Sequence, residues 1–263
     1  MAPPGTGIGK SHAAELRIHW SGAGKPVLFI PGWNTTAETV LSWIPESFLG
    51  RFRLGVLEWP GLGAAAEDAL PDDLDDFLAD LEHSLPSRPV ALVGFCLGGV
   101  AAWALSQRNL GSFRLVVLVD TPTCFPAVLS PLLVPGLGRA IFFLAQGTAL
   151  GRACVRAAVL RHDTSYPERF LGELFSFDRH VGIAYLRIFR RYGKNLSRIR
   201  REPSLPAFRL NGRASLRALA LPLGRRHTVD AKVLTLDGAG HFPAVEAPGV
   251  FFERLGAVLD ASL

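Results

Sequence analysis

The sequence predicts an α/β protein in which a mostly parallel sheet is flanked by helices and a helical cap is inserted late in the chain. Short apolar runs alternate with longer amphipathic runs along most of the 263 residues, which is typical of parallel strands covered by helices on both faces. The alternation stops between about residues 121 and 205, where helical patterns, arginines and several prolines occur without a clear strand. With 49% hydrophobic and 19% charged residues, the chain can bury one large core and a modest insertion.

Seven apolar runs are predicted as strands, and they cover residues 15–20, 27–30, 52–58, 90–95, 115–119, 207–210 and 232–236. A helix is predicted over residues 71–85, because one helical face collects Leu74, Phe77, Leu78, Leu81 and Leu85. Aspartates in its first turn suit the positive end of the helix dipole. We therefore expect a flexible N-terminal lead at residues 1–14 and a core made of two segments, 15–120 and 206–263. The cap is expected between these segments, at residues 121–205.

A short motif at the end of the fourth predicted strand predicts a nucleophile. Residues 94–99 read G-F-C-L-G-G, so Cys96 stands at the tip of a sharp strand-to-helix turn, between the glycines that such a crowded turn requires. The N–H of Leu97, at the positive end of the following helix, is expected to point at the reacting atom. The alternative interpretation makes Cys96 a small buried residue, since free cysteine is commonly buried. For Cys124 and Cys154 we expect packing in the cap.

Four motifs in this order resemble those of the α/β-hydrolase superfamily over essentially the whole chain. They are V-L-F-I-P-G-W at 27–33, W-P-G-L-G at 59–63, the elbow at 94–99, and G-A-G-H-F-P at 238–243 followed by E-A-P at 246–248. The resemblance implies that His241 activates Cys96 and that the N–H groups of Trp33 and Leu97 form an oxyanion hole. The first turn and the run at 121–125 resemble carboxylesterases that cleave pimeloyl-carrier-protein methyl ester. The elbow is more similar to those of dienelactone hydrolases and polyhydroxyalkanoate synthases.

The acid of the catalytic triad departs from the usual family pattern. Most members carry an aspartate in a turn after the strand that precedes the histidine strand, and Ser215 stands at that position here. Asp120 follows the strand after the nucleophile helix, where haloalkane dehalogenases and some lipases keep their acid, so the resemblance implies that Asp120 replaces it. In the alternative, Asp120 only caps a turn and the enzyme works with a Cys–His pair. Asp237, directly before the histidine turn, is a turn residue in many relatives.

These residues together predict covalent acyl transfer. His241 would take the proton from Cys96, or hold it in a thiolate–imidazolium pair, while Asp120 fixes the imidazole tautomer. We favour hydrolysis of a carboxylic ester or thioester with a largely apolar acyl group. The alternatives are acyl transfer or cyclisation on a carrier-bound chain, and a non-catalytic binding protein on the same fold. The expected substrate pocket comprises Asn34, Phe95, Phe125, Phe142, Phe143 and Phe242, although apolar cap residues could equally be ordinary packing.

The net charge of +5 arises largely from arginine. A basic stretch could receive an acidic carrier protein at Arg187, Arg190, Arg191 and Lys194, although a solvated helix face explains it equally simply. We expect no nucleic-acid partner, since no recognisable binding motif or stacking platform accompanies the charge. Glycine, proline and arginine interrupt the most apolar stretch, around residues 132–150, so no membrane span is expected. With no visible signal peptide and three cysteines without a regular spacing, we expect a cytoplasmic protein. We expect no cofactor and no metal.

Overall fold

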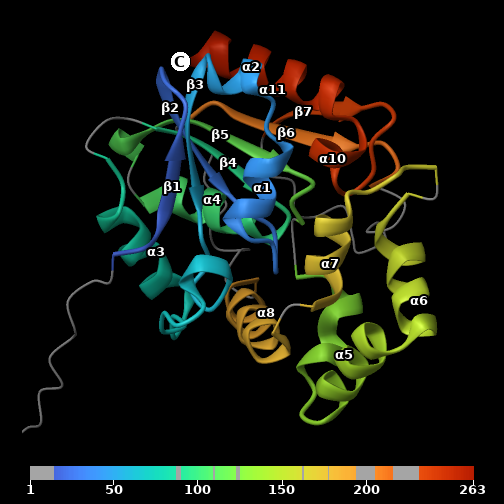
Figure 1. Ribbon diagram of the computed structural model, residues 1–263. Coiled ribbons are helices and arrows are strands. Elements are labelled where there is room, and N and C mark those ends of the chain that lie inside the picture. Colours follow the sequence, from blue (N-terminus) through green and yellow to red (C-terminus); the bar gives the residue numbers. More distant parts are fainter. Residues whose placement is uncertain are drawn as a thin grey trace, which may run out of the picture.

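The computed structural model describes residues 15–86, 90–108, 110–122, 125–161, 163–176, 178–193, 205–215 and 231–263. Its centre is a sheet of seven strands in the order β1-β3-β2-β4-β5-β6-β7 (Figure 1). The strands are β1 (Ile18–Ser21), β2 (Lys25–Ile30), β3 (Phe52–Leu57), β4 (Val90–Phe95), β5 (Phe113–Val119), β6 (Ala207–Gly212) and β7 (Lys232–Leu236). Only β1 pairs antiparallel among these strands, so the prediction of a mostly parallel sheet is confirmed.

Helices cover both faces of the sheet, as the near-continuous burial of the central strands requires. On one face, α3 (Leu74–His83) and α4 (Leu97–Arg108) pack with alternate strand residues such as Leu28, Ile30 and Leu92. The other face carries α1 (Ala37–Trp43), α2 (Glu46–Leu49) and α11 (Pro248–Ser262), which pack against strand residues such as Val27 and Phe29. Three short elements complete the core: the 3₁₀ helices η1 (Gly63–Ala65) and η2 (Leu110–Ser112), and α10 (Pro243–Glu246).

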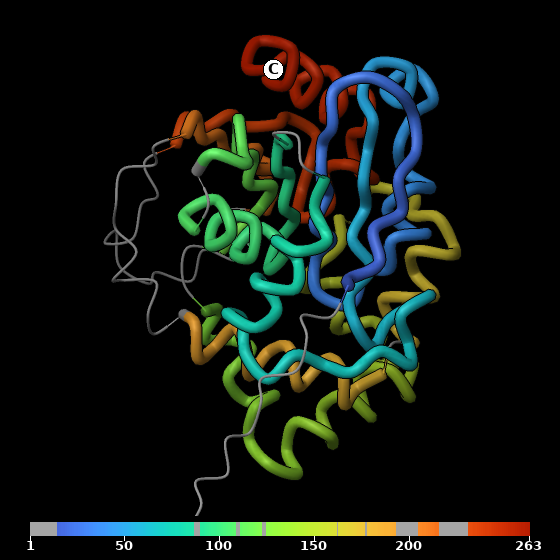
Figure 2. The backbone as a smooth tube through the Cα atoms, turned by 90° about the vertical axis from the view of Figure 1, so that its left-hand side faces the viewer, coloured from blue at the N-terminus to red at the C-terminus, as the bar shows by residue number. Residues whose placement is uncertain are grey.

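Between β5 and β6 the described residues form helices. These are η3 (Ala127–Leu133), α5 (Leu137–Gly147), α6 (Ala149–Val159), α7 (Glu168–Ser176) and α8 (Arg179–Gly193), which we call the cap helices. Figures 1 and 2 both place α5 and α6 at the end of the molecule remote from α11. The boundaries predicted for the lead, the core and the cap remain predictions.

Polar contacts tie the cap helices to the core. The Thr36 hydroxyl, at the N-terminus of α1, donates to Glu173 on α7 over 2.6 Å, and Tyr185 on α8 donates to the carbonyl of Pro60 over 2.8 Å. In the described residues, no single helix has the length and apolar composition of a membrane span. The pair η3 and α5 passes such a test together but is bent by 107° at its junction.

Candidate active site

The backbone around Cys96 forms a sharp turn that only small neighbours permit. Cys96 has a positive φ of 49°, and its N–H bonds to the carbonyl of Val119 over 2.9 Å. A Cβ on Gly94 would lie 2.5 Å from the Cα of Gly99, and one on Gly98 would lie 2.1 Å from the carbonyl oxygen of Pro31. Strand, turn and helix are therefore packed too closely for a side chain at position 94 or 98, two residues before and after the cysteine.

The thiol of Cys96 lies in a partly buried position against the hydrophobic core. Burial raises its pKa to about 12, the N–H of Leu97 donates to the sulfur and partly offsets this, and the charge of Asp120 raises it further. Such a shift means that the resting cysteine is a neutral thiol near pH 7.

The predicted oxyanion turn lies beside this cysteine. A Cβ on Gly32 would sit 3.5 Å from the Cβ of Cys96, and the N–H of Thr35 closes a tight turn onto the carbonyl of Gly32 over 3.2 Å. Trp33, inside the turn, donates its indole N–H to the carbonyl of Gly182 in α8 over 3.0 Å. The structure thus brings the turn and the elbow together, as their motifs imply.

Asn34, the next residue in the turn, has a left-handed backbone conformation and a buried side chain. It has a φ of 56° and is 8% exposed. Within the part of the chain that the structure describes, neither its side-chain oxygen nor its nitrogen has a hydrogen-bond partner. A buried amide without a partner costs free energy, so it is a candidate for binding a polar group of a ligand.

Three residues from separate loops form a polar chain that ends at the imidazole. Asp120, at the end of β5 with a φ of 42°, accepts hydrogen bonds from the N–H of Gly212, over 3.3 Å, and from the hydroxyl of Ser215. The Ser215 oxygen lies 3.5 Å from Nδ1 of His241. The predicted acid therefore meets the histidine through Ser215, and the described residues show no direct Asp120–His241 hydrogen bond. They show none between the Cys96 sulfur and His241 either.

Burial controls the protonation of Asp120 and His241, the two ends of this hydrogen-bonded series. It raises the pKa of Asp120 to about 8, although the N–H of Gly212 and the hydroxyl of Ser215 both favour the carboxylate. It lowers the pKa of His241 to about 4. The resting imidazole is therefore neutral, so its unprotonated nitrogen can act as a base.

Glu246 holds the loop that carries His241, a role that the sequence analysis missed. Its Oε2 accepts hydrogen bonds from the N–H of Gly240, over 2.5 Å, and from the N–H of Phe242, over 3.2 Å, so both neighbours of His241 are fixed. Its Oε1 accepts from the hydroxyl of Tyr166, which precedes α7. The histidine loop is thereby joined to the cap.

A second buried carboxylate lies at the end of β3. Glu58 is 2% exposed and accepts hydrogen bonds from the N–H groups of Ala37, over 3.2 Å, and Ala64. A Cβ on Gly63 would touch this carboxylate at 2.8 Å. Burial raises the pKa of Glu58 to about 7.

The predicted pocket residues occupy different places. The Phe142 ring, 5% exposed, packs edge-on against Trp33 at 5.9 Å, and Phe242 lies 4.8 Å from the His241 ring. Phe125 is partly buried against the core face that carries α4. The other two predicted pocket phenylalanines, Phe95 and Phe143, lie away from the site.

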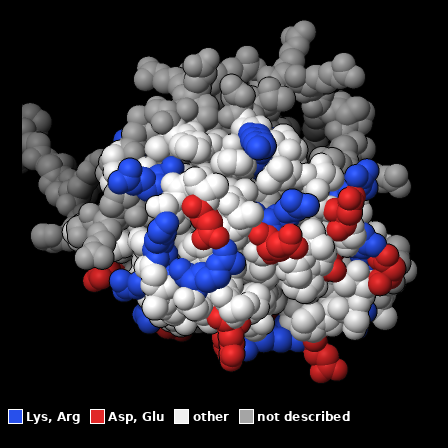
Figure 3. Space-filling model, turned by 90° about the horizontal axis from the view of Figure 1, so that it is seen from above, with Lys and Arg blue, Asp and Glu red and all other residues white. Residues whose placement is uncertain are grey.

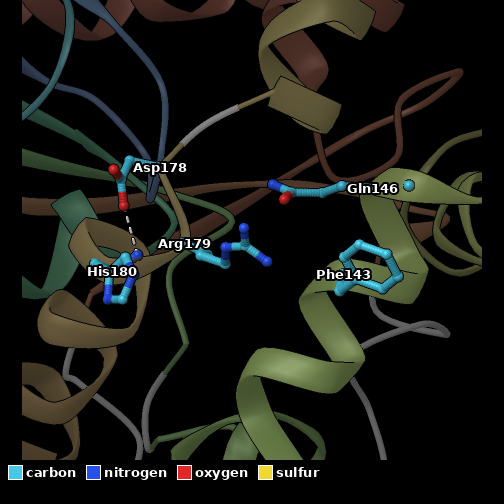
Figure 4. Close-up of a pocket in the computed structure, with 6 residues that line it drawn as sticks. Phe143, Gln146, Asp178, Arg179 and His180 are labelled. Carbon is cyan, nitrogen blue, oxygen red and sulfur yellow. Dashed lines mark hydrogen bonds between the residues drawn. The ribbon is translucent and has the colours of Figure 1, made fainter.

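Phe95 and Phe143 lie elsewhere because of the element that carries each. Phe95 points from β4 into the hydrophobic core, with ring contacts to Phe29 at 5.6 Å and Phe251 at 5.9 Å. Phe143 is 59% exposed, because it follows the buried Phe142 by one position and so lies about a quarter-turn around α5. It lines a cavity of about 410 Å³ between α5 and α8, together with Gln146, Arg179 and His180 (Figure 4).

The predicted basic patch falls on α8. Arg187, Arg190 and Arg191 are exposed there. Lys194 lies outside the described residues, as does Cys124.

The comparisons with known proteins agree with this architecture. A model of the alpha/beta hydrolase family matches residues 27–254. A pimeloyl-[acyl-carrier protein] methyl ester esterase of Nitrosomonas europaea is 32% identical over 112 residues, which are 43% of this chain and 43% of that enzyme. Phytyl ester synthase 1 of Arabidopsis thaliana is 31% identical over 42% of this chain and 16% of its own. The matches thus span less than half the length of these curated relatives.

The fold also recurs among solved structures. A putative epoxide hydrolase from Pseudomonas aeruginosa superposes with a TM-score of 0.73 at 17% identity, covering 96% of this chain and 94% of that one. Because the family model spans strands β3 to β7, the elbow and the histidine turn, this chain belongs to the alpha/beta hydrolase family.

Proposed function

We propose that the protein hydrolyses a carboxylic ester or thioester with a largely apolar acyl group, through an acyl-enzyme on Cys96. The observation that carries the proposal is the position of Cys96 in the elbow, with a φ of 49°, beside the Gly32 turn. There the N–H groups of Leu97 and Trp33 would bind the oxyanion. Similarity to a pimeloyl-[acyl-carrier protein] methyl ester esterase supports ester cleavage.

Proton transfer begins from two neutral groups. Burial keeps Cys96 protonated and His241 unprotonated near pH 7, which favours His241 as a general base over a preformed thiolate–imidazolium pair. As the sulfur attacks the carbonyl carbon, its proton passes to Nε2 of His241, since Nδ1 faces Ser215. The imidazolium then protonates the leaving alcohol or thiol, and water hydrolyses the thioester in the same way.

Asp120 supports this base through Ser215. The serine hydroxyl donates to the carboxyl group of Asp120 and can accept the Nδ1–H of His241, which fixes the imidazole tautomer with its free lone pair toward Cys96. As the imidazolium forms, its charge stabilises the Asp120 carboxylate. Asp120 and Ser215 are thus positioning residues.

The ring contacts near the site support an apolar acyl group. Phe142 of the cap packs against Trp33, and Phe242 packs against His241 and, at 4.9 Å, Phe170. The buried amide of Asn34 would bind a polar atom of the same substrate, such as a carbonyl oxygen.

A carrier-bound acyl chain is compatible with these features. The exposed Arg187, Arg190 and Arg191 could pair with an acidic carrier protein or the phosphate of its prosthetic arm. A cytoplasmic location remains a prediction.

Turnover of p-nitrophenyl esters of increasing acyl length tests the proposal. We expect hydrolysis that improves with longer chains and is lost in Cys96→Ala, whereas Cys154→Ala, which removes an exposed thiol, serves as the matched control. An acyl adduct that only an added amine or thiol discharges would favour acyl transfer instead. The absence of both adduct and turnover would favour a binding protein.

A further inference from the structure

The outer surface of the cap exposes large apolar side chains next to one another in the fold. On α5, Leu137, Phe143 and Leu144 are 47%, 59% and 55% exposed, and Leu150 at the start of α6 is 76% exposed. Val134, in the turn before α5, is 48% exposed. We call these five residues the cap apolar surface.

The α5 members of this surface lie on the exposed side of one helix. Positions 137, 140, 144 and 147 of α5 follow one another at helical spacing, and all are exposed, whereas Gly138 and Phe142 of the same helix are buried. The two helices are directly connected, since α5 ends at Gly147 and α6 begins at Ala149. A surface helix of a soluble domain normally turns polar residues outward, so an apolar outer face indicates a binding surface.

The segment that carries this surface has charged residues of a single sign. Residues 125–161 contain four arginines (Arg139, Arg152, Arg156 and Arg161) and no aspartate or glutamate. Arg161 pairs with Asp163, whereas Arg139 on α5 and Arg156 on α6 are exposed, the latter with its guanidinium 5.7 Å from the centre of the Phe175 ring. The opposite end of the molecule differs, because Figure 3 shows basic and acidic side chains interleaved there.

The cavity between α5 and α8 places a further arginine in a recess at the edge of this surface. In Figure 4 the guanidinium of Arg179 points into the space that Phe143 and Gln146 face from α5. Asp178 also lines the cavity, but its carboxylate accepts the N–H groups of His180, over 2.6 Å, and Val181, over 3.3 Å, at the start of α8.

We propose that the cap apolar surface docks onto an anionic lipid bilayer. Leucine and phenylalanine side chains would enter the boundary between headgroups and acyl chains, while Arg139 and Arg156 pair with lipid phosphates and Arg179 reaches a headgroup from the recess. A partner that docks through acidic side chains alone fits less well, because it would leave the large apolar side chains without apolar partners. The proposal is independent of the chemistry at Cys96.

Vesicle flotation tests the proposal on the full chain. We expect the protein to float with vesicles of phosphatidylcholine mixed with phosphatidylglycerol, and to float with phosphatidylcholine alone far less. Leu144→Gln/Leu150→Gln should lower the partition coefficient at least about tenfold, because each substitution removes a side chain that would leave water. The matched control, Val233→Gln/Val250→Gln, alters residues that are 56% and 42% exposed outside the cap, and should bind like the wild type.

A second pair of variants tests the charge. Arg139→Gln/Arg156→Gln should abolish the preference for phosphatidylglycerol, and its folding can be verified by circular dichroism independently of the leucine variant. Failure of the wild type to float would overturn the proposal, as would equal binding by the leucine variant and the valine control. Binding of a purified acidic carrier protein that depends on Leu144, without flotation, would assign the surface to a protein partner instead.

Discussion

Replacing Ser215 by alanine isolates the link between Asp120 and the imidazole. Ser215 is 3% exposed, so the substitution removes a hydroxyl from a closed site and leaves the fold little room to admit solvent. Asp120 would keep only the N–H of Gly212 as a partner among the described contacts, and Nδ1 of His241 would lose its neighbour at 3.5 Å.

The size of the effect follows from the kind of hydrogen bond removed. A hydrogen bond to a charged group is worth about 1.5–3 kcal/mol, and this bond acts on the imidazolium that forms during the reaction. We therefore expect kcat/KM to fall about 10- to 150-fold in Ser215→Ala.

A pH profile separates positioning from a structural role. Burial raises the pKa of Asp120 to about 8 and the Ser215 hydroxyl lowers it, so the acid limb of kcat/KM should lie near pH 8 and move upward in Ser215→Ala. Asp120→Asn should remove this limb. The double variant should be no slower than the slower single variant, because both act on the same imidazole. A Ser215→Ala rate within about twofold of wild type would refute the link from Asp120 through Ser215 to His241. So would a double variant whose loss of rate equals the product of the two single losses.

Three further predictions follow from the same contacts. Alkylation of Cys96 by iodoacetamide, followed by peptide mapping, should stay slow at neutral pH and accelerate only toward a pKa of about 12; an inflection near the ordinary thiol value would contradict its burial. Tyr166→Phe removes the hydroxyl bound to Glu246, so it should lower the free energy of unfolding by about 0.5–1.5 kcal/mol, as measured by urea denaturation. It should also reduce kcat in ester turnover; an unchanged kcat would show that this contact does not affect the position of His241. The folded pKa of Glu58, about 7, exceeds its ordinary 4.5, so the folded state binds the proton more tightly and stability should fall as pH rises from about 4.5 through 7. Urea titrations should show a shallower fall in Glu58→Gln than in the wild type, because the raised pKa of Asp120 still contributes in both; equal slopes would contradict the shift at Glu58.

The sheet could be predicted from the sequence because buried parallel strands leave a strong local signal. The run at 90–95 coincides with β4, and the elbow after it is marked by glycines at fixed spacing around Cys96. The antiparallel pairing of β1 was not predicted, since an edge strand of four residues carries little pattern of its own.

The arrangement around the imidazole could not be predicted in the same way. Asp120, Ser215 and His241 come from three distant loops, and their order in space depends on how those loops meet. The motif reveals only that the usual aspartate is missing at position 215. Glu246 belongs to the closing motif, but a carboxylate that binds its own loop leaves no periodic signal.

The pocket residues divide for a similar reason. Phe142 and Phe143 are adjacent in an apolar run, yet the helix turns one toward Trp33 and the other outward. Which of the two faces inward depends on how α5 docks on its neighbours, and composition does not encode that.

The most direct test of the central claim is a quenched intact-mass measurement after brief mixing with a p-nitrophenyl ester, followed by peptide mapping. The mass of one acyl group should appear on the peptide that contains Cys96 and be absent from Cys96→Ala. Ester turnover that persists in Cys96→Ala, or an acyl group on any other residue, would contradict it.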